Sequence, residues 1–109
     1  MKVGRITEFV EGWLLGNFEP SLFRTETIEI AIKRFNAGEE HYCHFQGRAT
    51  ELTVVIEGKI ELGGVTLERD EYLRLEPREH GTLKVWENST VLSVKFPSIP
   101  GDKQECSEH

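Results

Sequence analysis

Three polar side chains in the middle of the sequence have the types and spacing of a metal site. His44 and Gln46 are separated by one residue, and Glu51 follows a short turn at Gly47-Arg48. Residues i and i+2 of a β-strand point to the same face, so a strand places the imidazole and the amide side by side. The turn then lets Glu51 return on the neighbouring strand and face the same interior. An imidazole nitrogen, an amide oxygen and a carboxylate suit a divalent transition metal such as Zn, Fe, Mn or Ni.

The segment from Gly38 to Gly58 resembles the first motif of the cupin family, G-x5-H-x-H-x3-4-E-x6-G. Gly38, His44, Glu51 and Gly58 are in phase with it, and Gln46 stands where the second histidine would be. The phosphomannose isomerase branch of the cupins, as the resemblance suggests, uses a glutamine among its ligands. The resemblance implies a cupin jelly-roll barrel, or double-stranded β-helix, with a metal held by His44, Gln46 and Glu51.

The second cupin motif, G-x5-P-x-G-x2-H-x3-N, is mostly absent. Counting from Pro77 puts Glu71 at its first glycine, Glu79 at its second glycine and Thr82 at its histidine. His80 lies two positions before that expected histidine and shares its strand parity. His80 is therefore the candidate fourth metal ligand, provided that the preceding loop has a different shape.

Two neighbouring residues are candidate substrate contacts. Tyr42 has the same parity as His44, so its phenol is expected to face the lumen, although a core aromatic with a hydrogen-bonded tip is the alternative. Thr53 offers a hydroxyl to a ligand in the barrel. His41 and Cys43 fall at the opposite parity; His41 is expected on the outer face or in the preceding loop, and Cys43 on the outer face.

These side chains must be positioned by strands, because alternation at period two recurs and no stretch has sustained helical spacing. The clearest run spans Thr27 to Lys33, in which three isoleucines share one dry face. The Gly63-Gly64 pair predicts a tight hairpin, since glycine tolerates the positive φ that such turns need. The pattern favours an all-β sandwich or closed barrel. The short strands expected from residue 50 onward are 52–56, 59–62, 65–68, 72–75, 83–86 and 91–96.

Length and composition limit the architecture and the partners. A chain of 109 residues with 38% hydrophobic content predicts a single domain over residues 1–97, followed by a polar and flexible tail at 98–109 with nothing to bury. A net charge of -6 repels polyanions, which argues against a nucleic-acid partner. No window approaches the roughly 20 apolar residues that span a bilayer, so we expect no membrane partner and a cytoplasmic location. Cys43 and Cys106 are far apart and are expected to be free thiols.

The strand from Leu52 to Ile56 is apolar on both faces and therefore needs cover on both. The cupin resemblance implies a homodimer, which would provide that cover.

Three functions stay open. The first is a metal-dependent cupin acting on or sensing a small polar metabolite, by isomerase, decarboxylase or dioxygenase chemistry. The second is a metal-free module that binds a sugar or an acid in the lumen. The third is a structural dimerisation domain whose lumen is filled by side chains.

Overall fold

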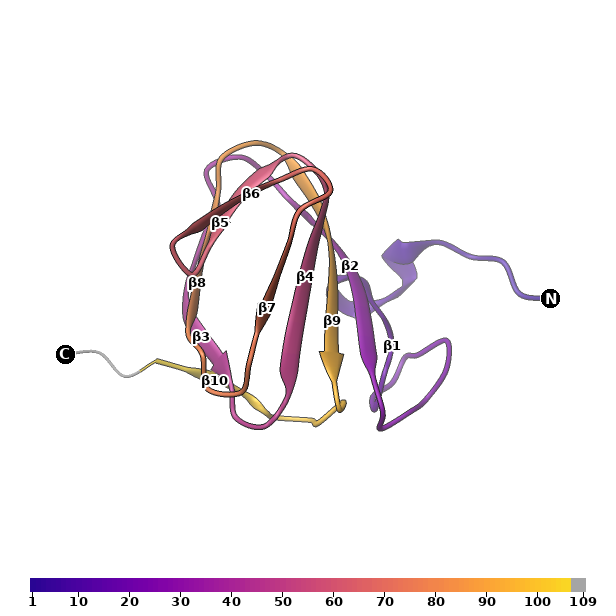
Figure 1. Cartoon of the computed structure of the whole chain (residues 1–109). Coiled ribbons are helices and arrows are strands. Elements are labelled where there is room, and N and C mark those ends of the chain that lie inside the picture. Colours follow the sequence, from indigo (N-terminus) through magenta and orange to yellow (C-terminus); the bar gives the residue numbers. More distant parts are fainter. Residues whose placement is uncertain (107–109) are drawn as a thin grey trace.

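The computed structural model describes residues 1–106, which form two antiparallel five-stranded sheets that face each other (Figure 1). The first sheet has the order β1-β2-β9-β4-β7, and the second has the order β10-β3-β8-β5-β6. Two short 3-10 helices, η1 and η2, precede β1. The all-β, double-stranded β-helix architecture expected from the sequence is therefore confirmed. The bounds are η1 Ile6–Glu8, η2 Val10–Gly12, β1 Trp13–Leu15, β2 Glu29–Phe35, β3 Glu40–Gln46, β4 Thr50–Glu57, β5 Lys59–Leu62, β6 Val65–Glu68, β7 Tyr72–Leu75, β8 Gly81–Val85, β9 Ser89–Phe96 and β10 Lys103–Glu105.

Glycines account for two of the sharp reversals of the chain. Gly63 and Gly64 have φ values of 60° and 81° and join β5 to β6, as the hairpin prediction required. Gly58 between β4 and β5 has φ 98°, and a Cβ at this position would lie 2.2 Å from the Ser89 hydroxyl. The last glycine of the motif therefore serves both a left-handed conformation and a close approach to β9.

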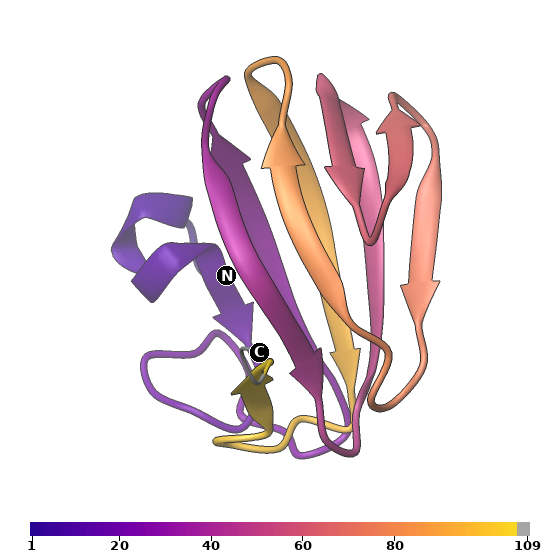
Figure 2. The same ribbon diagram turned by 90° about the vertical axis from the view of Figure 1, so that its left-hand side faces the viewer.

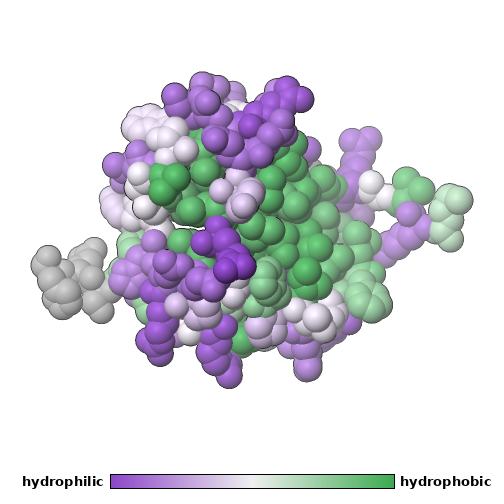
Figure 3. Space-filling model, viewed as in Figure 1, coloured by the Kyte–Doolittle hydropathy of each residue, from purple (hydrophilic) through white to green (hydrophobic). Residues whose placement is uncertain are grey.

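The apolar face of β2 lies on the outside of the barrel. Ile30 and Ile32 pair with Val94 and Leu92 of β9, which in turn pair with residues of β4. The alternate residues of β2 face the second sheet, and among them Lys33 lines the interior. Figure 3 shows the resulting apolar surface as a green area over β4, β9 and β2. This outer apolar face consists of Ile30, Ile32, Leu52, Val54, Leu92 and Val94.

The interior of the barrel is closed at one end by a dry core. Val55 of β4 and Ile60 of β5 have no exposed surface, and three further residues are nearly as well buried. Phe35, Leu73 and Leu83 pack against this group. The full core group is Val55, Ile60, Leu67, Val85 and Val91.

Residues 98–106 differ from the expected free tail. Ser98 and Asp102 are 4% and 7% exposed, and β10 pairs with β3 from Lys103↔Gln46 to Glu105↔His44. Figure 2 shows β10, in gold, beside the lower end of β3. The polar residues of this segment bury hydrogen-bonding groups instead of apolar surface, which is why hydropathy did not reveal them. Residues 107–109 of the predicted tail lie outside the described residues.

Within residues 1–106, the helices are too short and too polar to cross a membrane.

Candidate functional site

A cavity of about 800 Å³ lies between the two sheets, next to the dry core. His44, Gln46, Glu51 and Thr53 all line it, together with Lys33 and Lys103. Gln46 is 5% exposed and Thr53 is 6% exposed. Four of the residues singled out in the sequence therefore meet in one place. Aliphatic side chains complete the lining, among them Ile60, Leu62, Leu75, Leu83 and Val91.

A bulge in β3 changes which residues face this cavity. The pairing of β3 with β8 runs from His41↔Leu83 to His44↔Gly81, so one extra residue lies between the two histidines. His41 consequently lines the cavity, contrary to the expectation of an outer position. Tyr42, expected to face the lumen, is 79% exposed and is absent from the lining. The alternation of side chains along the strand predicted the wrong face for both residues, because the bulge inserts an extra residue between them and His44.

His41 is held at the edge of the cavity by two neighbours. Its Nε2 lies 3.3 Å from Glu39 Oε1, and its ring stacks edge-on against Phe35 with centroids 5.4 Å apart. The backbone N–H of Asn36 and then His41 hold the pKa of Glu39 below its usual value. The pKa of His44 is also lowered, first by burial and then by Lys103, so the neutral imidazole is favoured at this position.

Two lysines, Lys33 and Lys103, line the cavity, and Lys95 lines a small pocket beside it; the sequence analysis predicted none of them. Lys33 Nζ and Lys95 Nζ lie 4.8 Å and 4.9 Å from the ring centroid of Trp13, so one indole supports both ammonium groups. Lys103 comes from β10 and pairs with Gln46. Within residues 1–106, none of these three lysines has a carboxylate oxygen within 4.0 Å of its ammonium group.

Burial and repulsion by neighbouring lysines lower the pKa of Lys33 and of Lys95. Burial is the largest cause that lowers the pKa of Lys33 to about 8, and Lys103 and Lys95 add to the effect. The pKa of Lys95 is lowered mainly by burial, against the opposing influence of Glu51 and Glu29. Glu29 accepts a hydrogen bond from the Ser98 hydroxyl at 2.9 Å. The cavity lining thus combines the cations Lys33, Arg34 and Lys103 with the carboxylates of Glu11, Glu39 and Glu51.

Asp102 fixes the segment that carries Lys103. Its carboxylate, which is 6% exposed, accepts the backbone N–H of Arg48 at 3.0 Å and of Ala49 at 2.9 Å. These bonds fasten the chain before β10 to the turn that connects β3 with β4. The same turn separates Gln46 from Glu51, so a single carboxylate connects the segment that carries Lys103 to the turn between two other residues of the cavity lining.

His80 and the two cysteines lie apart from the cavity lining. The His80 ring stands 5.2 Å from the ring of Phe45, centroid to centroid, beside Cys43 and Cys106. Cys43 and Cys106 form a disulfide, so the expectation of free thiols is wrong. The prediction depended on their separation in the sequence, which β10 removes by pairing with β3. The disulfide also removes one argument for a reducing compartment, which rested on free thiols.

The donor set of the cavity fits a metal only in part. His44, Gln46 and Glu51 could supply three donors, but His80, the predicted fourth, lies elsewhere. Glu51 also pairs in register with Lys95, which offers the carboxylate a competing positive charge. Ammonium groups around a cation site raise the cost of binding a divalent ion. For these reasons no reaction step is assigned to a metal.

The sequence contains a usable signal for some of the residues that were missed. Lys33 and Lys95 each end an alternating strand pattern, on the face opposite the aliphatic residues. Pro100-Gly101 is a typical turn signal, and Gly101 adopts φ 75° where the chain turns back toward β3. Read together, these features would have predicted a returning strand and a lysine beside the barrel.

Comparison with known proteins identifies the fold and nothing narrower. No protein-family model and no curated protein matches the sequence. The DMSP lyase DddQ from Ruegeria pomeroyi matches with a TM-score of 0.72 and 12% identity, over 85% of this chain and 49% of that chain. The chain therefore spans about half the length of that protein.

Two smaller proteins correspond over more of their own length. An uncharacterised Klebsiella pneumoniae protein with a double-stranded β-helix domain has a TM-score of 0.71 and 16% identity, over 98% of this chain and 93% of that one. A cupin protein from Bacteroides fragilis has a TM-score of 0.57 and 17% identity, over 74% and 73%. The chain thus has the double-stranded β-helix fold of these cupin-type proteins.

Proposed function

We propose that the barrel binds a small hydroxylated carboxylate, such as a sugar acid, without requiring a metal. The observation that carries this proposal is the pair Lys33 and Lys103 on the lining of one cavity, with Lys95 in the small adjoining pocket that shares Gln46 and Lys103 with it. Within the described residues their ammonium groups have no carboxylate oxygen within 4.0 Å. A charge held partly out of water is stabilised by a counter-charge, which the carboxylate of a ligand supplies.

The remaining polar side chains of the cavity suit hydroxyl groups. Glu51 and Gln46 offer acceptor oxygens, and Thr53 offers both a donor and an acceptor. The aliphatic lining next to the dry core suits the carbon skeleton of the ligand. The combination favours an acid that carries hydroxyl groups over a simple inorganic anion.

The proposal is tested by titrating the protein with glucuronate and with glucose, which share a ring and differ in the carboxylate. We expect glucuronate to shift the amide resonances of β2 and β10 and glucose to leave them unchanged. Lys103→Met should weaken glucuronate binding about tenfold or more, because a charge-assisted contact is lost. Lys59→Met is the matched control, since Lys59 lies on β5 beside Glu68 at 3.8 Å. Equal responses to both sugars, or none to glucuronate and to citrate, would overturn the proposal.

A divalent metal on His44, Gln46 and Glu51 is the second candidate, favoured by the meeting of these three residues at one cavity. A bound metal would polarise a substrate oxygen, as isomerases, decarboxylases and dioxygenases of this kind require. Elemental analysis of protein purified without a tag or chelator decides between the two. Stoichiometric metal that disappears in His44→Ala would favour the metal site. Metal-free protein, even after incubation with Zn, Fe, Mn and Ni salts, would favour the anion site.

We also propose that the outer apolar face of the first sheet is the contact of a homodimer. Its six aliphatic side chains form two rows across β2, β9 and β4 and carry no charge, so a second copy of the same face is a suitable cover. Leu92→Lys should give a monomer in sedimentation analysis while Lys84→Ala, on the other sheet, leaves the mass unchanged. A monomeric wild-type chain would exclude this contact.

The third possible function, a purely structural domain with a lumen filled by side chains, gains no support from a barrel that keeps a cavity of about 800 Å³.

A further inference from the structure

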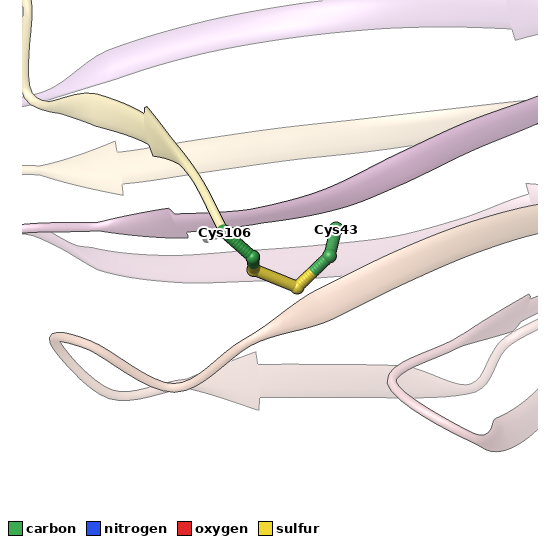
Figure 4. Close-up of a disulfide and its surroundings, with 2 residues drawn as sticks. All are labelled: Cys43 and Cys106. Atoms are coloured by element: carbon green, nitrogen blue, oxygen red, sulfur yellow. A yellow bond between two sulfur atoms is a disulfide. The ribbon is translucent and has the colours of Figure 1, made fainter. Parts of the chain in front are cut away.

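A second cluster of metal-ligating side chains lies outside the cavity, where β10 meets β3. The sulfurs of Cys43 and Cys106 and a ring nitrogen of His80 all lie within 4.8 Å of one another. Figure 4 shows the two cysteines bridging their strands, and their Cα atoms are 5.5 Å apart. Cys43 belongs to β3, Cys106 follows β10, and His80 comes from the connection between β7 and β8. The fold therefore brings together three segments that are distant in the sequence.

Contacts other than the disulfide hold this cluster together. The backbone N–H of Cys106 donates to the carbonyl of Cys43 at 3.1 Å, which continues the pairing of β10 with β3. The ring of Phe45 packs against His80 and limits where its imidazole can lie. The two sulfurs would consequently stay close to His80 after the disulfide is reduced.

We propose that the reduced chain binds Zn²⁺ through Cys43, Cys106 and His80, so that this position holds either a disulfide or a zinc ion. Tetrahedral zinc with bonds of about 2.0 to 2.3 Å places its ligand atoms roughly 3.5 to 4 Å apart. The two sulfurs and the His80 nitrogen lie within 4.8 Å of one another, and after reduction rotation of the cysteine side chains would move the sulfurs, now bonded to each other, to this separation. Two thiolates and an imidazole are ligands that zinc prefers, and water completes the fourth position.

The exchange between the two forms balances. A dithiol reductant transfers two electrons and two protons to the Cys43–Cys106 disulfide: the S–S bond breaks, two cysteine thiols form, and the reductant closes to its own disulfide. On binding Zn²⁺, each thiol releases a proton and its sulfur donates an electron pair to the metal. In a reducing compartment such as the predicted cytoplasm, the thiol form would dominate and zinc would take the place of the covalent link.

Either link would fasten the segment that serves the cavity. Lys103 and Asp102 lie three and four positions before Cys106, and β10 is short. Without a link, only the pairing with β3 and the bonds of Asp102 hold this segment. The cluster would thus preserve the cavity in both redox conditions.

The test is metal binding by the full chain after reduction with a phosphine, which is oxidised to its oxide. Zn²⁺ is titrated in competition with a chromophoric chelator, and Co²⁺ is used as a spectroscopic probe. We expect one high-affinity site per chain and a thiolate-to-cobalt absorption band in the near ultraviolet. The oxidised chain should show neither. The thiolate band distinguishes this site from any metal at His44, Gln46 and Glu51, which has no sulfur ligand.

Matched variants separate the three ligands from the fold. His80→Asn should weaken zinc binding about tenfold or more in the reduced chain, yet form the disulfide normally when oxidised. His41→Asn, which removes an imidazole at the cavity, should leave the zinc affinity unchanged. Cys106→Ser should abolish the cobalt band. Wild-type protein that binds no more zinc than Cys106→Ser, or His80→Asn that binds as tightly as wild type, would overturn the assignment.

Discussion

The two ends of the barrel interior are built on the same strands but differ in what their inward side chains do. On β4, Val55 is fully buried in the dry core, whereas Thr53 and Glu51 line the cavity. On β9, Val91 belongs to the core, and Lys95 lies at the polar end, where its ammonium group packs against Trp13. Within a few residues of β9, the inward side chains therefore change from aliphatic to charged.

Because of this difference, residues at one end of the barrel mainly stabilise the fold, and residues at the other end are available to bind a ligand. Burial of aliphatic side chains at the closed end stabilises the fold, and this stability tolerates the cost of charges at the open end. Functional sites commonly break the rules that the rest of a fold follows. Substitutions at the closed end should therefore mainly lower stability, and substitutions of the lysines at the open end should mainly weaken ligand binding.

The largest expected effect is at the closed end. Ile60→Ala should lower the free energy of unfolding by about 3 to 4 kcal/mol, because Ile60 has no exposed surface and the substitution removes three buried carbon atoms and enlarges the space between the sheets. Thr53→Ala at the open end should cost less than about 1 kcal/mol, since it removes only one methyl group and one hydroxyl group. Urea denaturation of both variants measures the contrast. Similar losses at the two positions would remove the distinction between the ends.

Reduction of the disulfide should come next, at about 2 to 4 kcal/mol in the absence of metal. The bond joins residues 63 positions apart and attaches β10 to the polar end of the barrel. Denaturation with and without a phosphine, in the presence of a chelator, measures the loss. The double variant Cys43→Ser with Cys106→Ser should match the reduced wild type. An unchanged midpoint would mean that strand pairing alone holds β10.

Asp102→Ala should cost about 2 kcal/mol, because two backbone N–H groups lose a charged acceptor in a buried setting. It should also weaken glucuronate binding, since Lys103 follows directly. Arg48→Ala is the control. The Arg48 side chain is 77% exposed and its guanidinium Nε lies 4.0 Å from Asp102, so its charge should contribute less than about 0.5 kcal/mol. A comparable loss in both variants would assign the effect to the ion pair instead.

The smallest effect should have the opposite sign. Lys33→Met should raise the free energy of unfolding at neutral pH by about 1 kcal/mol and abolish glucuronate binding, since it replaces an unpaired buried charge with an apolar side chain. The charged groups facing Lys33 are Lys103, Lys95, Glu51 and Glu11. A Lys33→Met variant that is less stable than the wild type and still binds glucuronate would contradict the proposed difference between the two ends of the barrel.

The pH dependence of this gain follows from the lowered pKa of Lys33. Below a pH of about 8 both the folded and the unfolded chain carry the proton, so the cost of the buried charge is fully present. Between about 8 and the unperturbed 10.5 only the unfolded chain keeps it, and the wild-type stability rises relative to Lys33→Met. Glucuronate affinity should fall over the same interval, because the neutral amine no longer attracts a carboxylate. Titrations and denaturation curves across this range measure both trends.

Much of the site could be predicted because local spacing encoded it. The motif between Gly38 and Gly58 placed His44, Gln46 and Glu51 at one interior, and all three line the cavity. Their roles as metal ligands stay a prediction. The errors at His41 and Tyr42 arose from a single inserted residue, since a bulge reverses strand parity without leaving a clear pattern in composition.

The sequence by itself determined the strands, the Gly63-Gly64 hairpin and the barrel class, because alternation and turn residues act over a few neighbouring positions. Only the tertiary structure decided which face of each strand is inside. Period-two alternation defines two faces equally well, and β2 turns its isoleucines outward and Lys33 inward. Tertiary structure likewise decided that Lys103 reaches the cavity and that Cys106 meets Cys43. Both depend on the pairing of β10 with a strand about 60 residues earlier, which local sequence does not encode.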